Sequence, residues 1–378
     1  MRSAVRFRLP PELEAAAPPE ARGLRRDHVR LLLVDRASGA AGHHRFHELP
    51  GLLEPGDLLV VNDSRTLPAS LLGRTARGEP LEVRLAARDG RRWAALVLGV
   101  PADGTDPALV PTDARPPAPL LTAGERVGFA GGLGATVLGR HEEAGPLVWL
   151  AFDRAGERLA EALHRAGRPV RYAYVPRAWP LHHYQTLFAA GPGSAEMASA
   201  GRPFTVQTLR DLRQRGVGLA TISLHAGLST YGDPATDRRY VPAEPYLVPA
   251  ATAAAVAACR AAGGRVVAVG TTVVRALETA AAGMATVRPG PGVSRLRIGP
   301  GYRLAVVDGL LTGLHEPEAS HLDLLAAFLD RPALDRAYAA ALAAGYLWHE
   351  FGDVCLLLPR TSSPLCDGCV RNSTELPA

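Results

Sequence analysis

Residues 265–278, RVVAVGTTVVRALE, contain the clearest fold signal in the chain. The run Val266 to Val269 is short, continuous and apolar, as in a strand buried inside a parallel sheet. Gly270 then allows a tight turn, and Thr271 or Thr272 can cap a following helix. The segment therefore predicts a strand, a turn and a helix N-terminus, which is the building unit of an α/β fold.

The start of that helix is also a candidate ligand site. Free backbone amides at a helix N-terminus attract carboxylate or phosphate, and Arg275, one turn further on, adds a forked cationic donor. Glu278 follows three residues later on the same helical face. An ordinary capped helix with an ion pair between these two side chains explains the same residues, so the segment alone leaves both interpretations open.

Helix and strand patterns alternate through much of the chain. Helical periodicity covers 155–166, 207–215 and 250–262, and buried-strand patterns occur at 31–34, 58–61 and 218–224. These segments predict a main α/β domain with a parallel-rich sheet.

Between residues 69 and 153 the pattern changes. Short alternating segments such as 81–85, 93–97 and 147–152 are separated by turns rich in glycine and proline. This pattern is typical of an all-β module, and we predict a small barrel. The proline-rich stretch 101–119 is expected to be a long loop.

Polar residues that follow predicted strands, or lie near glycine-rich turns, are candidate contacts to a ligand. They are Asn62, Asp63, Arg65, Tyr184, Gln185, Thr186, Gly227, Thr230, His315 and Asp353. His225, at the end of the strand 218–224, is a candidate base, and a purely structural role explains it equally well.

Composition narrows the class of protein. The 378 residues carry a net charge of +5 that comes from arginine, since the sequence has no lysine, and this permits contact with nucleic acid without demonstrating it. No apolar run approaches the roughly 18 residues of a membrane span, and the N-terminus lacks a signal-peptide pattern. We therefore expect a cytoplasmic protein.

No metal site is predicted. Cys366 and Cys369 form a single CxxC without a second ligand pair, and His43, His44 and His47 lack a carboxylate in register. The sequence also lacks a nucleophile elbow, a dinucleotide fingerprint and a phosphate-binding lysine loop.

Seven segments, in order, resemble the QueA family, the S-adenosylmethionine:tRNA ribosyltransferase-isomerases of queuosine biosynthesis. They are LLLVDR, PGDLLVVNDSRTLPASLLGR, YQTLF, SLHAGLSTY, GGRVVAVGTTVVRALE, PGYRLAVVDGLLT and GYLWHEFGDVCLLL. The resemblance implies an α/β domain at 1–68 and 154–378, carrying the S-adenosylmethionine site and interrupted by a β-barrel domain at 69–153.

The resemblance also implies a reaction. S-adenosylmethionine is consumed as a substrate: its ribosyl part is transferred to 7-aminomethyl-7-deazaguanine in the anticodon region of tRNA and isomerised, which gives epoxyqueuosine and releases adenine and methionine. Neither a metal nor a separate cofactor is implied, and no membrane contact.

On this hypothesis the singled-out residues acquire roles. Arg275 and the amides of Gly270, Thr271 and Thr272 would hold the methionine carboxylate. Glu278 or Asp63 would complement positive charge, and His225 would act as the base or proton shuttle. Tyr184 would stack on adenine or contact the sulfonium.

The chain departs from the family pattern at basic positions. Glu318 stands where the family has a lysine, and Asp233 stands where it has a cation. Because RNA phosphates favour basic residues, a relative acting on a small acceptor, or only cleaving the sulfonium, is the alternative hypothesis. A binding protein without activity is a third. A steep salt dependence of tRNA binding would favour the RNA acceptor.

Overall fold

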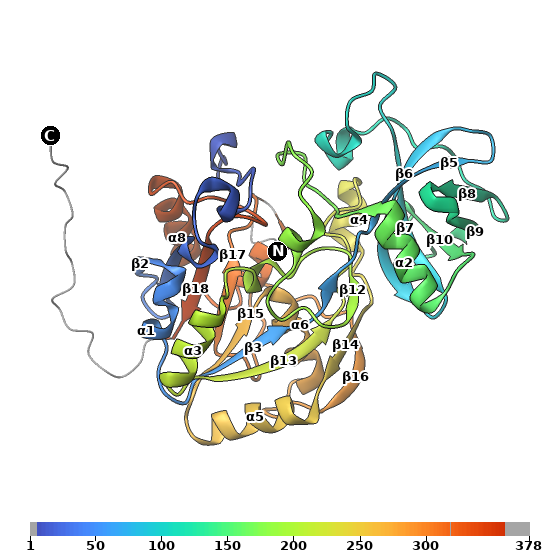
Figure 1. Cartoon of the computed structure of the whole chain (residues 1–378). Coiled ribbons are helices and arrows are strands. Elements are labelled where there is room, and N and C mark those ends of the chain that lie inside the picture. The colour runs from blue at the N-terminus through green and yellow to red at the C-terminus, as the bar shows by residue number, and fades with distance from the viewer. Residues whose placement is uncertain (1–5, 318, 360–378) are drawn as a thin grey trace, which may run out of the picture.

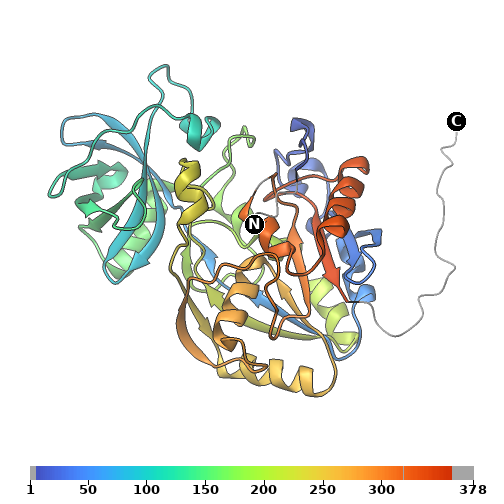
Figure 2. The ribbon, with the colours of Figure 1, turned by 180° about the vertical axis from the view of Figure 1, so that it is seen from behind.

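The computed structural model describes residues 6–317 and 319–359, and it shows two bodies packed side by side (Figures 1 and 2). One is a large α/β domain and the other is a β-barrel. Glu318 and the cysteine pair Cys366 and Cys369 lie outside the described residues.

A mixed sheet forms the centre of the α/β domain. In spatial order its strands are β16 (Gly290–Ser294), β14 (Glu244–Val248), β13 (Gly218–Leu224), β3 (Leu58–Asn62), β15 (Val266–Val269), β17 (Gly309–Gly313), β18 (Val354–Leu358), β1 (Arg30–Asp35) and β2 (Ala41–Arg45). The four central strands from β13 to β17 are parallel, as are β18 and β1. The parallel-rich α/β sheet expected from the sequence is confirmed.

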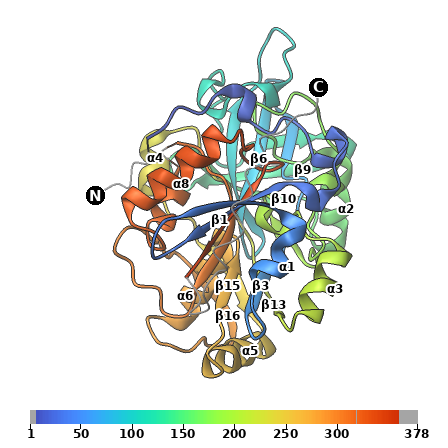
Figure 3. The same ribbon diagram turned by 90° about the vertical axis from the view of Figure 1, so that its left-hand side faces the viewer.

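Helices cover both faces of this sheet (Figure 3). On one face pack α5 (Ala250–Ala261), α6 (Thr271–Ala281), α7 (Ser320–Leu325) and α8 (Arg331–Ala343). On the other face pack α1 (Leu49–Leu52) and α3 (Val206–Gln214). Alternate residues of β3 enter the two cores: Leu58 and Val60 face the first group of helices, and Leu59 and Val61 face the second. Burial on both faces explains the continuous apolar runs of the central strands.

The second body is a closed antiparallel barrel. Its strands are β5 (Ser70–Thr75), β6 (Pro80–Asp89), β7 (Arg92–Gly99), β10 (Leu147–Phe152), β9 (Gly134–Arg140) and β8 (Arg126–Phe129), and β8 closes the ring by pairing with β5. The predicted small barrel is therefore confirmed. The stretch 101–119 contains only the short 3-10 turns Pro107–Leu109 and Thr112–Ala114.

The barrel extends beyond the boundary expected at residue 153. Helix α2 (Gly156–Ala166) inserts Leu159, Ala162 and Leu163 into the barrel core, and β11 (Gly167–Arg168) pairs with β5. The helical period of this segment predicts that it belongs to the α/β domain, but its apolar face packs into the barrel core. Periodicity predicts a helix without identifying the core against which the helix packs.

The remaining strands and α-helix are short. They are β4 (Arg65–Thr66), which pairs with β12 (Pro192–Ser194), and α4 (Pro234–Arg239). Thr205 caps α3, its hydroxyl accepting the Thr208 amide at 3.1 Å. None of the helices in the described part of the chain has the length and apolar character to span a bilayer.

Candidate active site

A cleft of about 1000 Å³ lies between the two bodies, at the carboxyl ends of the central parallel strands. Its floor is formed by the residues that follow β13, β15 and β17, which is where open α/β sheets bind ligands. The barrel supplies one wall through Arg84 and the loop 110–113. Arg84 donates to the Thr112 hydroxyl at 3.0 Å and fixes this loop over the cleft.

The N-terminus of α6 opens into the cleft. Gly270, Thr271 and Thr272 line it, as predicted for the sequence Gly-Thr-Thr. The threonines do not cap the helix, however: Gly270 is the N-cap residue, with φ of 98°, and no side chain caps the helix. The first amides of a helix have no intrahelical acceptor, so those of Thr271 and Thr272 are available to an anion.

Arg275 and Glu278 lie on α6 but do not line the cleft. The Arg275 guanidinium forms an ion pair with Glu244 of β14 and donates to the Leu296 carbonyl at 3.1 Å. The Glu278 carboxylate is buried and accepts three backbone amides, those of residues 305–307, at 2.8 to 3.1 Å. The expected anion clamp and charge partner are therefore engaged in holding neighbouring segments of the fold, and they do not pair with each other.

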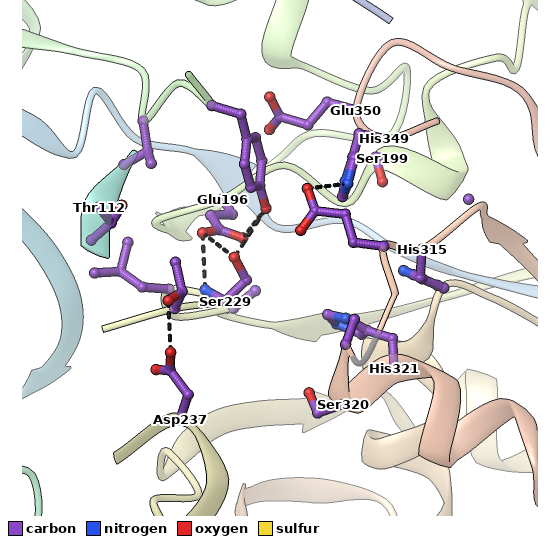
Figure 4. Close-up of a pocket in the computed structure, with 18 of the residues that line it drawn as sticks. Thr112, Glu196, Ser199, Ser229, Asp237, His315, Ser320, His321, His349 and Glu350 are labelled. Carbon is purple, nitrogen blue, oxygen red and sulfur yellow. Dashed lines mark hydrogen bonds and ion pairs between the residues drawn. The ribbon is translucent and has the colours of Figure 1, made fainter. Parts of the chain in front are cut away.

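An ordered carboxylate, Glu196, faces the cleft from the glycine-rich segment before α3 (Figure 4). Its Oε1 accepts the amide and the hydroxyl of Ser229 at 2.9 and 3.0 Å, and its Oε2 accepts the Tyr172 hydroxyl at 3.3 Å. Burial raises the pKa of Glu196 despite these hydrogen bonds.

His349 lines the same cleft with an unusual backbone. Its φ of 71° lies in the left-handed region, where non-glycine residues are uncommon and often functional. Its Nε2 contacts the Glu316 carboxylate, and its ring stacks on Tyr172 and Tyr174 at centroid distances of 5.3 Å. Burial acts to raise the pKa of Glu316, but the neighbouring His349 outweighs it and lowers that pKa. A histidine oriented by a carboxylate is a typical general base.

Glu350 is the next residue and also lines the cleft. Its side chain is buried, and its Oε2 has no hydrogen-bond partner among the described residues. Burial, followed by the negative charge of Glu196, raises the pKa of Glu350 well above its usual value.

A pair of histidines forms part of the wall. His315, at the end of β17, contacts the Thr312 hydroxyl through Nε2 at 2.9 Å and stacks on His321 at 4.6 Å. Burial lowers the pKa of His321 to about 4, with a further contribution from the charge of Arg275, and lowers that of His315 well below its usual value. Both rings are therefore neutral hydrogen-bonding groups at neutral pH.

Thr230 lines the cleft as well, and its hydroxyl donates to Asp237 of α4 at 2.8 Å. Of the residues predicted from the sequence, the structure thus brings together Thr230, Gly270, Thr271, Thr272 and His315 at one cleft.

The other predicted contacts lie outside the cleft lining. Asn62 is buried and binds the Leu224 backbone, while Asp63 accepts from the Ser223 hydroxyl. Gln185 bonds to both backbone groups of Thr66, and Asp353 accepts the amides of Arg30 and Leu347. Four more residues complete the set: Arg65 is exposed in β4, Tyr184 packs on Phe351, Thr186 bonds to the Phe188 amide, and Gly227 bonds to Glu244.

His225, the expected base, also lies outside the lining residues. Its Nδ1 bonds to the Ser64 hydroxyl at 2.8 Å, and burial lowers its pKa. A Cβ on Gly193 would lie 2.2 Å from this ring nitrogen, so glycine is required there by close approach. The ring is thus held between Ser64 and Gly193.

Several cleft residues were not singled out from the sequence: Tyr172, Tyr174, Glu196, His321, His349 and Glu350. Two signals were available. Glu196 lies within the segment 191–205, which is rich in glycine and serine, and His349 and Glu350 directly precede Phe351-Gly352-Asp353. The two tyrosines lie in a loop without a pattern of its own.

Within residues 6–317 and 319–359, no group of three or more histidine, cysteine, aspartate or glutamate side chains is arranged to hold a metal ion. Two histidines of the segment 43–47 have partners within the protein: His43 bonds to the Tyr346 hydroxyl, and His44 bonds to Glu48.

Comparison with known proteins gives one consistent result. The family model described as "Queuosine biosynthesis protein" matches residues 2–357. The S-adenosylmethionine:tRNA ribosyltransferase-isomerase of Gloeobacter violaceus is 40% identical over 359 residues, which cover 93% of this chain and 94% of the relative. The protein of the same name from Symbiobacterium thermophilum is 39% identical, covering 93% and 98% of the two chains.

A solved structure is similar along the whole fold. The crystal structure of the S-adenosylmethionine tRNA ribosyltransferase from Thermotoga maritima is 30% identical and covers 93% of this chain and 99% of its own, with a TM-score of 0.51.

Proposed function

This chain belongs to the queuosine biosynthesis protein family, and we propose that the cleft between its two domains is where S-adenosylmethionine is bound and consumed. The chain is an S-adenosylmethionine:tRNA ribosyltransferase-isomerase, as are the relatives that align with 93% of it. It transfers the ribosyl part of S-adenosylmethionine to 7-aminomethyl-7-deazaguanine in tRNA and isomerises it to the epoxycyclopentanediol of epoxyqueuosine.

The reaction makes three demands on the site. The sulfonium acidifies the hydrogens on the neighbouring C5′ carbon, so a base can remove one of them. The acceptor amine then forms a new carbon–nitrogen bond, while the bonds to adenine and to the methionine sulfur break. The donor also presents a carboxylate and two positive charges that must be held in register with the acceptor.

We assign the donor carboxylate to the N-terminus of α6. Thr271 and Thr272 line the cleft, their amides have no acceptor within the helix, and the helix dipole favours an anion there. This keeps the predicted role of the Gly-Thr-Thr turn. We do not place Arg275 in that role, because its guanidinium is paired with Glu244.

For proton removal we assign His349 with Glu316. Glu316 holds the ring, and the two stacked tyrosines fix its plane. The assignment replaces His225, whose Nδ1 is bonded to Ser64 outside the cleft lining. The single observation that supports the proposal most strongly is that these groups and the α6 N-terminus line one cleft at the carboxyl edge of the sheet.

Two finer points belong to the same proposal. The tRNA would bind through its anticodon region, where the acceptor base lies, and the protein would act in the cytoplasm. A small acceptor remains the alternative, and the relatives reported above carry no name that supports it.

The test is a product assay. The purified protein is incubated with S-adenosylmethionine, with and without tRNA carrying 7-aminomethyl-7-deazaguanine, and adenine release is measured together with nucleoside mass after digestion. Adenine release that depends on this tRNA and accompanies a heavier nucleoside is the expected result. Equal release without tRNA would refute the RNA acceptor, and no release under any condition would refute the activity.

A further inference from the structure

Two carboxylates of the cleft, Glu196 and Glu350, have no cationic partner. Neither forms an ion pair with a residue in the described part of the chain. The arginines whose charges reach them are already engaged: Arg84 binds Glu82 and Thr112, and Arg202 binds Glu20 and the His183 carbonyl. Glu350 is buried and Glu196 is half-buried. Taking an acid out of water without a cation is unfavourable, so their presence in a cleft requires an explanation.

The two acids differ in how they are held. Glu196 is fixed by three hydrogen bonds, two from Ser229 and one from Tyr172. Glu350 is 9% exposed and lines the cleft, yet its Oε2 is buried without a hydrogen-bond partner among residues 6–317 and 319–359. Native structures rarely leave such an oxygen unsatisfied, and a functional role is one of the recognised reasons.

Aromatic faces lie beside these acids. Tyr172 and Tyr174 stack at 5.6 Å with an interplanar angle of 19°, and both line the cleft. Ring faces together with carboxylates make a site for a weakly hydrated organic cation, because the ring quadrupole and the negative charges attract the same ligand. Figure 4 shows Glu196 and Glu350 around one space, with His349 beside them.

We propose that Glu196, Glu350 and the faces of Tyr172 and Tyr174 form a subsite for an organic cation of the substrates. This inference rests on the proposed function, which supplies three such cations: the donor sulfonium, the donor α-ammonium and the acceptor ammonium. In the reacting complex the sulfonium and the acceptor amine must lie close together, since both bond to the ribosyl group. A subsite for either of these two cations lies at the reacting end of the donor, whereas a subsite for the α-ammonium lies next to the carboxylate at α6.

The test compares ligands that differ by one charge. S-adenosylmethionine and S-adenosylhomocysteine share every group except the methylated sulfonium, and their Kd values are measured by calorimetry for wild type, Glu350→Gln and Glu196→Gln. Glutamine keeps the shape of the side chain and its acceptor oxygen. Glu79→Gln is the matched control, because it removes one carboxylate from an exposed pair on the barrel, away from the cleft.

Each source of the cation gives its own pattern. If the subsite holds the sulfonium, wild type prefers S-adenosylmethionine, and the cleft variants lose about tenfold in affinity for it alone. If it holds the α-ammonium, both ligands weaken equally. If it holds the acceptor ammonium, both Kd values stay constant and the KM for tRNA rises about tenfold.

The proposal is overturned if both cleft variants, folded as judged by circular dichroism, keep the two Kd values and the tRNA KM of the Glu79→Gln control. Failure of the function itself is recognised separately. In that case wild type releases no adenine with modified tRNA, while its binding of the two ligands can still be compared.

Discussion

Replacing Arg275 with methionine distinguishes a role in the fold from a role in ligand binding. In the structure its guanidinium pairs with Glu244, whose side chain is only 6% exposed, and it also donates to the Leu296 carbonyl. Methionine keeps most of the volume and removes the charge. The substitution would leave Glu244 buried, with only the Gly227 amide donating to it among residues 6–317 and 319–359.

The size of the effect follows from that burial. Breaking a buried ion pair from one side costs about 3–5 kcal/mol, because an uncompensated charge remains. Burial already raises the pKa of Glu244, and loss of Arg275 would raise it further, so protonation of the acid limits the loss. We therefore expect the lower part of this range, about 3 kcal/mol.

The assay is urea unfolding of wild type, Arg275→Met and the double variant Arg275→Met/Glu244→Gln. The double variant should recover much of the lost stability, because it removes both charges and leaves no buried charge unpaired. Calorimetric titration should give the same Kd for S-adenosylmethionine, within about threefold, for any variant that is folded. An Arg275→Met protein as stable as wild type that binds S-adenosylmethionine about tenfold more weakly would refute this reasoning and restore Arg275 as a ligand contact.

Two further predictions concern the cleft. His349→Asn removes the imidazole, and asparagine tolerates the left-handed backbone at this position. We expect kcat for adenine release to fall by about 100-fold or more, with the Kd for S-adenosylmethionine nearly constant. The control His44→Asn, outside the cleft, should match wild type, and equal kcat values for the two variants would exclude His349 as the base. Burial, followed by the negative charge of Glu196, raises the pKa of Glu350 in the free protein; Arg202 opposes this, and Tyr172 and Tyr174 lie near the carboxyl. Binding a cation should lower that pKa and release a proton, so affinity for the cation should increase as pH rises toward the raised pKa, and Glu350→Gln should abolish this dependence. A pH profile of binding that is identical in the two proteins would contradict the coupling.

Much of the fold could be predicted because its strands carry strong local signals. The run Val266 to Val269 is buried on both faces, and the continuous apolar pattern reports this directly. The barrel was recognisable from the change of period after Ala69. The sequence predicts helix α2 in the α/β domain, but the helix packs on the barrel. An amphipathic pattern shows which face of a helix is buried, but it does not show which domain that face packs against.

The site was less predictable, for a different physical reason. Polar residues at strand ends, such as Asn62 and Asp63, give the same sequence pattern whether they contact a ligand or form hydrogen bonds with the neighbouring strand. In the structure Asn62 bonds to the Leu224 backbone and Asp63 to the Ser223 hydroxyl, so these two serve the sheet. Tyr172, Glu196 and Glu350 come from three separated segments, and only tertiary packing brings them to one cleft.

The structural position of Asp233 explains why an acid stands there. An acid at this position was an argument against an RNA acceptor, because phosphates repel carboxylates. In the structure Asp233 is the N-cap of α4, where it accepts the amides of Ala235 and Thr236 and the Thr236 hydroxyl. A carboxylate is favoured at a helix N-terminus for reasons unrelated to any substrate.

Asp233 therefore carries no information about the acceptor. The acids that do bear on substrate choice are Glu196 and Glu350, which line the cleft. An acidic cleft suits a sulfonium donor and an amine acceptor, and the phosphates of a tRNA need not enter it, because only the acceptor base has to reach the donor. These carboxylates would repel a phosphate inside the cleft, so they favour entry of the acceptor base alone. An acidic cleft is therefore compatible with an RNA acceptor.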